Sequence, residues 1–222
     1  MKRLFPIFLS LFLPLCAASA SAAAFSPLQI GMGYLLPWEG FELQLVSAET
    51  PVVGLRLNLL ASQNETVAGL DLGLGSISGT FSGIRLVGVS MTGEELNGIS
   101  VGVLDLEQTV NGIQLAPFAY AQGVRGIQAG LIPFSNSGSV CGIQLGILNF
   151  SRDIRGVQIG LWTNTRDLRG LQIGLANFAD SPHGLQIGLV NHARSLHGLQ
   201  IGLLNIGPDS SIPILPLLRA SF

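Results

Sequence analysis

The sequence predicts an all-β fold of tandem strand–turn repeats of about fourteen residues, most simply a β-solenoid. Three observations indicate this. The phrase GLQIGL begins at Gly170, Gly184 and Gly198, with equal spacing. Within each phrase, aliphatic residues alternate with Gly or Gln, and a period of two is typical of a β-strand. Glycine occurs 29 times, twice within six residues of the phrase, which disfavours a helix.

Residues 1–24 have the pattern of a secretory signal peptide. A basic start is followed by an apolar run from Leu4 to Leu15, and Ala22 and Ala24 supply a cleavage site. Cleavage after Ala20 and lipidation at Cys16 are alternatives, which leaves two possible mature N-termini and one possible lipid anchor. The pattern predicts export to the cell envelope, the outer-membrane surface or the medium.

Composition excludes some partners. Charged residues make up only 11% of the chain and hydrophobic residues 48%. Removing Lys2 and Arg3 with the signal peptide leaves nine of eleven basic residues against thirteen acidic ones, a net charge of −4. Nucleic acid is therefore not an expected partner. No later run of about 18 apolar residues exists, so no transmembrane helix is predicted.

The mature chain divides into three segments. Residues 25–53 form an N-terminal cap that includes a short strand from Phe41 to Val46, and residues 212–222 form a closing segment. Residues 54–211 form the repeat domain of about eleven units. The units open at Gly54, Gly69, Gly83, Gly98, Gly112, Gly126, Gly142, Gly156, Gly170, Gly184 and Gly198.

Alternation divides each unit into two faces. In the unit 170–183, one face carries Leu171, Ile173 and Leu175, and the other carries Gly and Gln. We expect the aliphatic face to form a dry core and Gln172 to face solvent. Asn177 and Ala179 continue the aliphatic face. The Asn amide is expected to bind free backbone groups where the strand ends.

A closed antiparallel β-barrel is the alternative architecture. Turns of nearly equal length and an aromatic content of only 7% favour the solenoid. The uncharged strands and the terminal Phe222 favour the barrel, although Pro213 and Pro216 suit its last strand poorly. A solenoid places Gln172, Gln186 and Gln200 in one column, whereas a barrel places Gln172 opposite Gly188.

Three parts of the sequence together resemble a known protein family. They are the opening VVGLRLNLLASQNETVAGLDLGL (Val52 to Leu74), the tandem G-[LIV]-Q-[LIV]-G-L-x-N units, and the ending IPILPLLRASF. The resemblance is to a family of uncharacterised exported bacterial surface-repeat proteins. It implies export and a location at the surface or in the envelope. It implies no activity and no catalytic residues.

Histidine and cysteine offer the few candidates for chemistry. His183 and His197 share the last position of their units, so a solenoid would stack them about 4.8 Å apart. Arg155 and Arg169 hold the same position in preceding units. A metal or anion site is the functional interpretation, and a solvated basic edge is the simpler one, because zinc needs three or four ligands. His192 lies elsewhere in its unit. Cys141, three units from the nearest histidine, is interpreted as a small buried hydrophobic residue.

The remaining charged pairs are interpreted as solvated loop residues: Glu94–Glu95, Arg152–Asp153 and Arg166–Asp167. We therefore name no catalytic, cofactor-binding or metal-binding residue. The sequence predicts a non-enzymatic exported protein of the envelope or cell surface, acting as a scaffold or as an adhesion module toward an unidentified partner. The alternative function is an outer-membrane β-barrel that passes small solutes.

Overall fold

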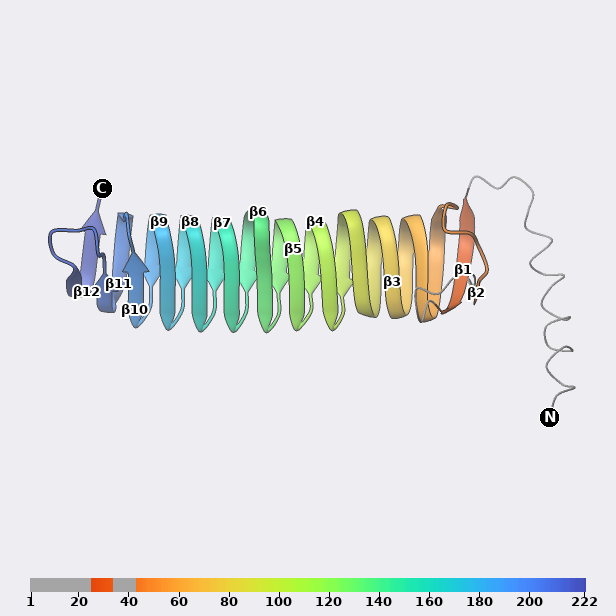
Figure 1. Cartoon of the computed structure of the whole chain (residues 1–222), viewed down its shortest axis with the longest axis horizontal. Coiled ribbons are helices and arrows are strands. Elements are labelled where there is room, and N and C mark those ends of the chain that lie inside the picture. Colours follow the sequence, from red (N-terminus) through yellow and green to blue (C-terminus); the bar gives the residue numbers. More distant parts are fainter. Residues whose placement is uncertain (1–24, 34–42) are drawn as a thin grey trace, which may run out of the picture.

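The chain forms a β-solenoid, as a computed structural model covering residues 25–33 and 43–222 shows. Figure 1 shows the stacked coils as one rod, with β1 and β2 at one end and β12 at the other. The strands are β1 (Ser26–Gly33), β2 (Leu43–Gln44), β3 (Val52–Val101), β4 (Leu104–Leu115), β5 (Phe118–Ala129), β6 (Ile132–Leu145), β7 (Leu148–Ile159), β8 (Trp162–Ile173), β9 (Ala176–Ile187), β10 (Val190–Ala193), β11 (His197–Ile206) and β12 (Ile214–Ser221). The predicted signal peptide lies outside the described residues.

Adjacent coils pair in parallel, one repeat unit apart. Gln172 pairs with Gln186, which pairs with Gln200, so the predicted column is confirmed. The parallel register excludes the antiparallel pairing on which the barrel alternative depended, and the barrel is wrong. We number coil positions 1 to 14 from the glycine that opens each unit. Each position then forms a column along the rod.

Position 1 requires glycine because of its backbone conformation and its neighbours. Gly170 has a φ of +138°, in the region that favours glycine. A Cβ added there would lie 2.1 Å from the carbonyl oxygen of Gly156 in the preceding coil. The same contact recurs along the whole column. The glycines of the repeat therefore allow the coils to approach each other at the strand spacing.

The two faces of the repeat point opposite to the expectation. Gln172 is fully buried, and Leu175 is 52% exposed. Inside the rod, each Gln amide after Gln114 donates to the Gln of the preceding coil, as from Gln186 to Gln172 at 2.6 Å and from Gln172 to Gln158 at 2.9 Å. Coil stacking sets identical amides at the spacing that such a ladder needs. The aliphatic face is therefore on the outside, and its assignment as the core is wrong.

A bend at positions 5 and 6 changes the alternation within each coil. Gly174 and Leu175 form this bend, and after it Asn177 and Ala179 point inward as expected. The Asn177 amide donates to the backbone carbonyl of Ile187 at 2.8 Å and to the Asn191 side chain at 2.8 Å. The predicted role of this Asn is confirmed. The apolar core lies at positions 10 and 13, where Ala179, Leu168, Ile154, Val140, Val124 and Val110 pack.

At each end of the rod, the last strand pairs antiparallel with its neighbour. At the N-terminal end, β1 pairs in parallel with β3, and β2, from the predicted cap strand 41–46, pairs antiparallel with β1; residues 41 and 42 lie outside the described part. At the C-terminal end, β12 pairs antiparallel with β11. The β12–β11 register shifts around Pro216, where an edge strand tolerates proline.

Candidate functional site

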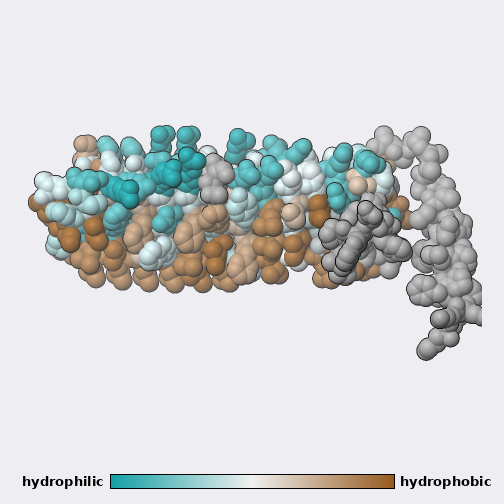
Figure 2. All heavy atoms as spheres, in the orientation of Figure 1, coloured by the Kyte–Doolittle hydropathy of each residue, from teal (hydrophilic) through white to brown (hydrophobic). Residues whose placement is uncertain are grey.

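The outer surface is divided lengthwise into an apolar and a polar band. We call the outward residues at positions 2, 4 and 6 the apolar face; in one coil these are Leu171, Ile173 and Leu175. At position 6, Leu161, Leu175 and Leu189 are 53%, 52% and 49% exposed. Figure 2 shows this band along the rod below a hydrophilic band. Monomeric soluble proteins rarely expose a continuous apolar patch of more than a few hundred Å², so this face is a candidate interaction surface.

The apolar face is hollowed near the C-terminal end of the rod. A depression of about 460 Å³ lies between the position 4 isoleucines and the position 6 leucines of the last coils, and Leu217 of β12 closes one side. The glycines at position 5, such as Gly188, form its floor because they have no side chain. The depression is lined only by aliphatic residues and glycine.

An aromatic column borders the apolar face on one side. Position 9 carries Tyr120, Phe134, Phe150, Phe178 and His192. Neighbouring rings contact each other, with centroids 5.8 Å apart for Tyr120–Phe134 and 5.9 Å for Phe178–His192. Asn164 interrupts the column, and there Trp162 at position 7 stacks on Phe178 at 4.5 Å. Aromatic side chains therefore separate aliphatic from charged residues on this side.

Two basic columns flank these apolar residues. Beyond the aromatic column, position 11 carries Arg152, Arg166, Asp180 and Arg194. On the other side, position 14 carries Arg125, Cys141, Arg155, Arg169, His183 and His197 in register. In the C-terminal half, the prevailing order around a coil is thus aliphatic, aromatic and basic on one side, and aliphatic, glycine and basic on the other.

A groove of about 550 Å³ runs along the rod between the aromatic column and position 11, across five coils. Phe150, Phe178 and Asn164 line its apolar side and its centre, and Arg152 and Arg166 line its charged side. Within the described residues, neither Arg152 nor Arg166 has a carboxylate within 4.0 Å, whereas Arg194 pairs with Asp180 at 3.3 Å. Three arginines and one aspartate give the groove a charge of +2.

The predicted histidine stack is confirmed. The rings of His183 and His197 are parallel within 3°, with centroids 4.6 Å apart. His192 lies in the aromatic column, away from this pair. In the part of the chain that the structure describes, no three His, Cys, Asp or Glu side chains come together as metal ligands. The pair is thus part of the basic column at position 14.

The other candidates lie on the polar surface. Cys141 is half-buried at position 14 between Arg125 and Arg155, so its assignment as a buried hydrophobic residue is wrong. Glu94 and Glu95 are exposed, as predicted, but they lie in β3 and not in a loop. Asp153 and Asp167 pair in register behind the groove arginines. Partial burial raises the pKa of Asp153, and the hydrogen bond and charge of Asp167 raise it further.

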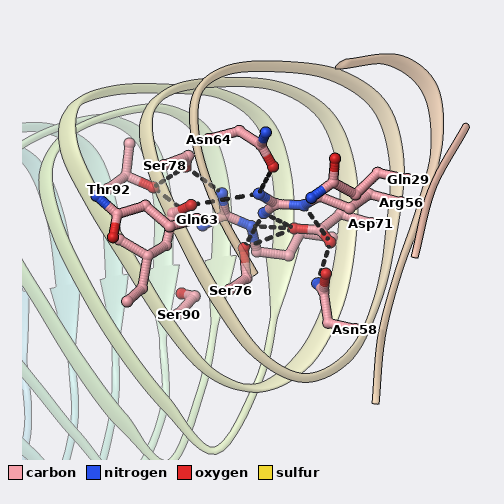
Figure 3. A network of polar contacts seen from close by, with 12 residues as sticks. Gln29, Arg56, Asn58, Gln63, Asn64, Asp71, Ser76, Ser78, Ser90 and Thr92 are labelled. Atoms are coloured by element: carbon pink, nitrogen blue, oxygen red, sulfur yellow. Dashed lines mark hydrogen bonds and ion pairs between the residues drawn. The ribbon is translucent and has the colours of Figure 1, made fainter. Parts of the chain in front are cut away.

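The N-terminal interior holds a buried ionic network that the sequence analysis missed (Figure 3). Arg56 binds Asp71 through two bonds, of 2.6 and 3.0 Å, and Arg85 contacts the same carboxylate at 3.1 Å. Arg85 also reaches Glu107 at 3.4 Å and lies 4.1 Å over the Phe81 ring. These charged side chains are at most 2% exposed. In the sequence, the signal for this network was that Arg56, Asp71 and Arg85 occupy position 3 of successive units, whereas the units from Gln114 onward carry Gln there.

Burial and ion pairing shift the carboxyl groups of this network in opposite directions. Burial raises the pKa of Asp71, but bonds and charge from Arg56, Ser76 and Arg85 outweigh it, and the pKa lies below its ordinary value. Burial raises the pKa of Asp105 above its ordinary value against hydrogen bonds from Ser100 and Ser90. Burial also raises the pKa of Glu107, to which the charge of Asp105 adds. The network is closed to solvent and has a structural role.

Among the described residues, no helix is long and apolar enough to cross a membrane. No protein-family model, curated protein or solved structure matches the chain significantly.

Proposed function

We propose that this chain is a non-enzymatic exported protein of the cell envelope that lies along a lipid surface, with its apolar face in the boundary between headgroups and acyl chains. The observation that carries the proposal is the exposed apolar face, which runs along the rod and is flanked by basic columns in its C-terminal half. The pattern of residues 1–24 and the family resemblance support export. The protein acts there as a scaffold or adhesion module that presents its polar band away from the lipid.

The order of side chains around the coil favours lipid as the occupant of this face. Aliphatic, aromatic and basic residues follow one another from position 6 to position 11, the order in which hydrocarbon, interface and phosphate follow one another in a bilayer. Arginine and aromatic side chains at such a boundary can bind headgroups while aliphatic neighbours insert. The all-aliphatic depression beside Leu217 is suited to an acyl chain.

The charges disfavour a second copy on the same face. Both edges of the apolar face are basic, with Arg155 and Arg169 on one side and Arg152 and Arg166 on the other. Two copies packed face to face with their C-terminal halves together would bring arginine columns against arginine columns, and like charges across an interface oppose association. Lipid phosphates would neutralise both edges. The alternative function of passing solutes required a barrel, and here the interior is filled with side chains.

A vesicle flotation experiment tests the proposal. The chain is purified from expressing cells after export, and its binding to phosphatidylcholine vesicles is compared with that of Leu161→Ser/Leu175→Ser. These side chains face outward, so the thermal unfolding midpoint should change by no more than a few degrees. We expect the double variant to bind roughly ten-fold more weakly, because two leucines lose their burial in lipid.

The matched control is Phe25→Ser/Ile212→Ser. These residues are 50% and 54% exposed, nearly the same as Leu161 and Leu175, but they lie in the terminal segments outside the apolar face. The control should bind like the unchanged chain. Equal loss in both variants, or no vesicle binding by any of them together with a dimer in analytical ultracentrifugation, would overturn the lipid proposal.

A further inference from the structure

We propose that the groove beside the aromatic column binds a phosphate monoester group carried by an amphiphile, so that the rod selects lipids with an exposed terminal phosphate. This inference rests on the proposed function, because the groove opens next to the face that would contact lipid. It adds a specific ligand chemistry to a surface that otherwise attracts lipid without selecting it.

The charge of the groove matches a phosphate monoester. Arg152 and Arg166 are exposed side chains of adjacent coils and occupy the same column, so their backbones lie about 4.8 Å apart. A guanidinium group presents several N–H donors in a plane and binds phosphate oxygens in pairs. A phosphate monoester carries a charge of about −1.5 to −2 at pH 7, which balances the groove charge of +2. A phosphodiester, with one charge, balances only half of it.

The arginines of the groove are available for an external anion. Asp180, the acid of the same column, pairs with Arg194 at 3.3 Å, on the side away from Arg166. Asp153 and Asp167 are neighbours of the groove arginines in sequence but do not line the groove. By contrast, Arg56 and Arg85 are bound to carboxylates inside the rod. The charges of Arg152 and Arg166 also act on Asp153 and partly offset the rise in its pKa, but neither arginine forms a salt bridge within the described residues, and both line the groove.

Asn164 shapes the centre of the groove. It stands in the aromatic column where neighbouring coils place Phe150 and Phe178. Its short side chain leaves room between these rings and adds an amide that can donate to and accept from hydroxyl groups. A headgroup can thus place its phosphate at Arg152 and Arg166, its polar atoms at Asn164, and its apolar remainder toward the aliphatic face.

Three vesicle compositions separate this inference from the proposed function. Phosphatidylcholine alone measures the apolar face. Phosphatidylcholine mixed with phosphatidylglycerol adds a diester, and mixing with phosphatidic acid, matched for total surface charge, adds a monoester. We expect the unchanged chain to bind the phosphatidic acid vesicles roughly ten-fold more tightly than the phosphatidylglycerol vesicles, because the two groove arginines can pair with both charges of one monoester group.

Matched double variants locate the effect. Arg152→Gln/Arg166→Gln removes two charges from the groove, and Arg155→Gln/Arg169→Gln removes two from the opposite edge in the same coils. The groove variant should lose the preference for phosphatidic acid, and its binding to phosphatidylcholine should equal that of the edge variant. The edge variant should keep the preference. Equal loss of preference in both variants, or retention in both, would overturn the inference and leave the proposed function standing.

Calorimetric titration with soluble glycerol 3-phosphate gives a test that needs no membrane. Binding that the groove variant loses and the edge variant keeps supports the site and identifies free phosphate esters as sufficient ligands. Binding confined to phosphatidic acid vesicles supports the site with the lipid as its ligand. If the chain binds neither glycerol 3-phosphate nor phosphatidic acid in preference to the diester, the groove is not a phosphate site.

Discussion

The N-terminal and C-terminal halves of the rod fill the same interior position with different chemistry. At position 3, the first units carry Arg56, Asp71 and Arg85, which form ion pairs. From Gln114 to Gln200 every unit carries Gln, and the amides form a ladder with bonds of 2.6 to 3.1 Å. The backbone register is parallel in both halves. The same coil can therefore satisfy a buried polar side chain at position 3 either through ion pairs or through an amide ladder.

The difference shows that the two interiors satisfy polar groups in different ways. In the ladder, each Gln has the same neighbours, so any unit resembles the next. In the ionic network, Asp71 must lie between two arginines, so each residue has one suitable place. A buried ion pair contributes little when intact, because desolvation offsets its attraction, but removing one partner leaves an uncompensated charge. The N-terminal half should therefore be the more sensitive to single substitutions.

The largest expected effect comes from Asp71→Ala. It would leave Arg56 and Arg85 buried beside each other without their shared carboxylate, and we expect the free energy of unfolding to fall by about 3–5 kcal/mol. Chemical denaturation followed by circular dichroism measures this. Asp209→Ala, at an exposed acid, should change it by less than about 0.5 kcal/mol. A loss of under 1 kcal/mol for Asp71→Ala would mean that the network is not buried as described.

A smaller effect is expected within the ladder. Gln158→Leu keeps most of the side-chain volume but leaves Gln144 without its donor and Gln172 without its acceptor. Buried orphaned groups cost about 1–3 kcal/mol each, so we expect a loss of roughly 2–4 kcal/mol. Gln200→Leu is the matched control, because at the end of the ladder it orphans only Gln186 and should cost about half as much. Equal losses would contradict a ladder of pairwise bonds.

The smallest effect concerns pH. Because burial raises the pKa of Asp105 and Glu107, the folded chain keeps protons that the unfolded chain releases. Their contribution to stability is complete below the ordinary carboxyl pKa, about 4, and is lost as the pH rises through the raised values. Asp71 behaves oppositely. Its pKa is lowered, so its contribution is complete above the ordinary value and is lost as the pH falls through the lowered one.

Glu107→Gln tests this dependence through denaturation curves between pH 4 and 8. We expect the free energy of unfolding to fall less steeply with rising pH in the variant, by at most about 1.4 kcal/mol per pH unit, the value for one proton. Glu65→Gln, at an exposed position, should leave the slope unchanged. A steeper slope in Glu107→Gln would show that the sign of the shift is wrong.

Spacing predicted the register of the fold once the parallel solenoid was preferred to the barrel on turn length and aromatic content. An exact repeat in a parallel stack places equal positions in columns, so the Gln column and the His183–His197 stack followed from counting residues. The backbone role of Asn177 followed from its place at the end of the aliphatic run. These predictions concern units of fourteen residues; in the longer units the register shifts, as between Thr92 and Glu95 and between Ser135 and Ser139.

The direction of each face was not predictable from the same pattern. Alternation places Gln172 and Ile173 on opposite faces but does not show which face points inward. Apolar residues are usually buried, but a large part of a protein's surface is also apolar, so an apolar face can be the outer one. At position 3 the coil interior holds side chains that bond along the axis, which aliphatic residues cannot do, whereas the apolar core lies at positions 10 and 13. The groove was missed for a related reason: Asn164, Arg152 and Arg166 come together only once the bend at Gly174 and its equivalents is known.

The ladder has a consequence for how the gene can change. Because a Gln in the ladder donates to the coil before it and accepts from the coil after it, a duplicated unit placed between Gly142 and His197 would bring its own satisfied amide, glycine and position 13 residue. Recombination between the nearly identical units could therefore lengthen or shorten the rod without a compensating mutation. A duplication among the first units would interrupt the order of Arg56, Asp71 and Arg85. Heritable variation in length should therefore accumulate toward the C-terminal end.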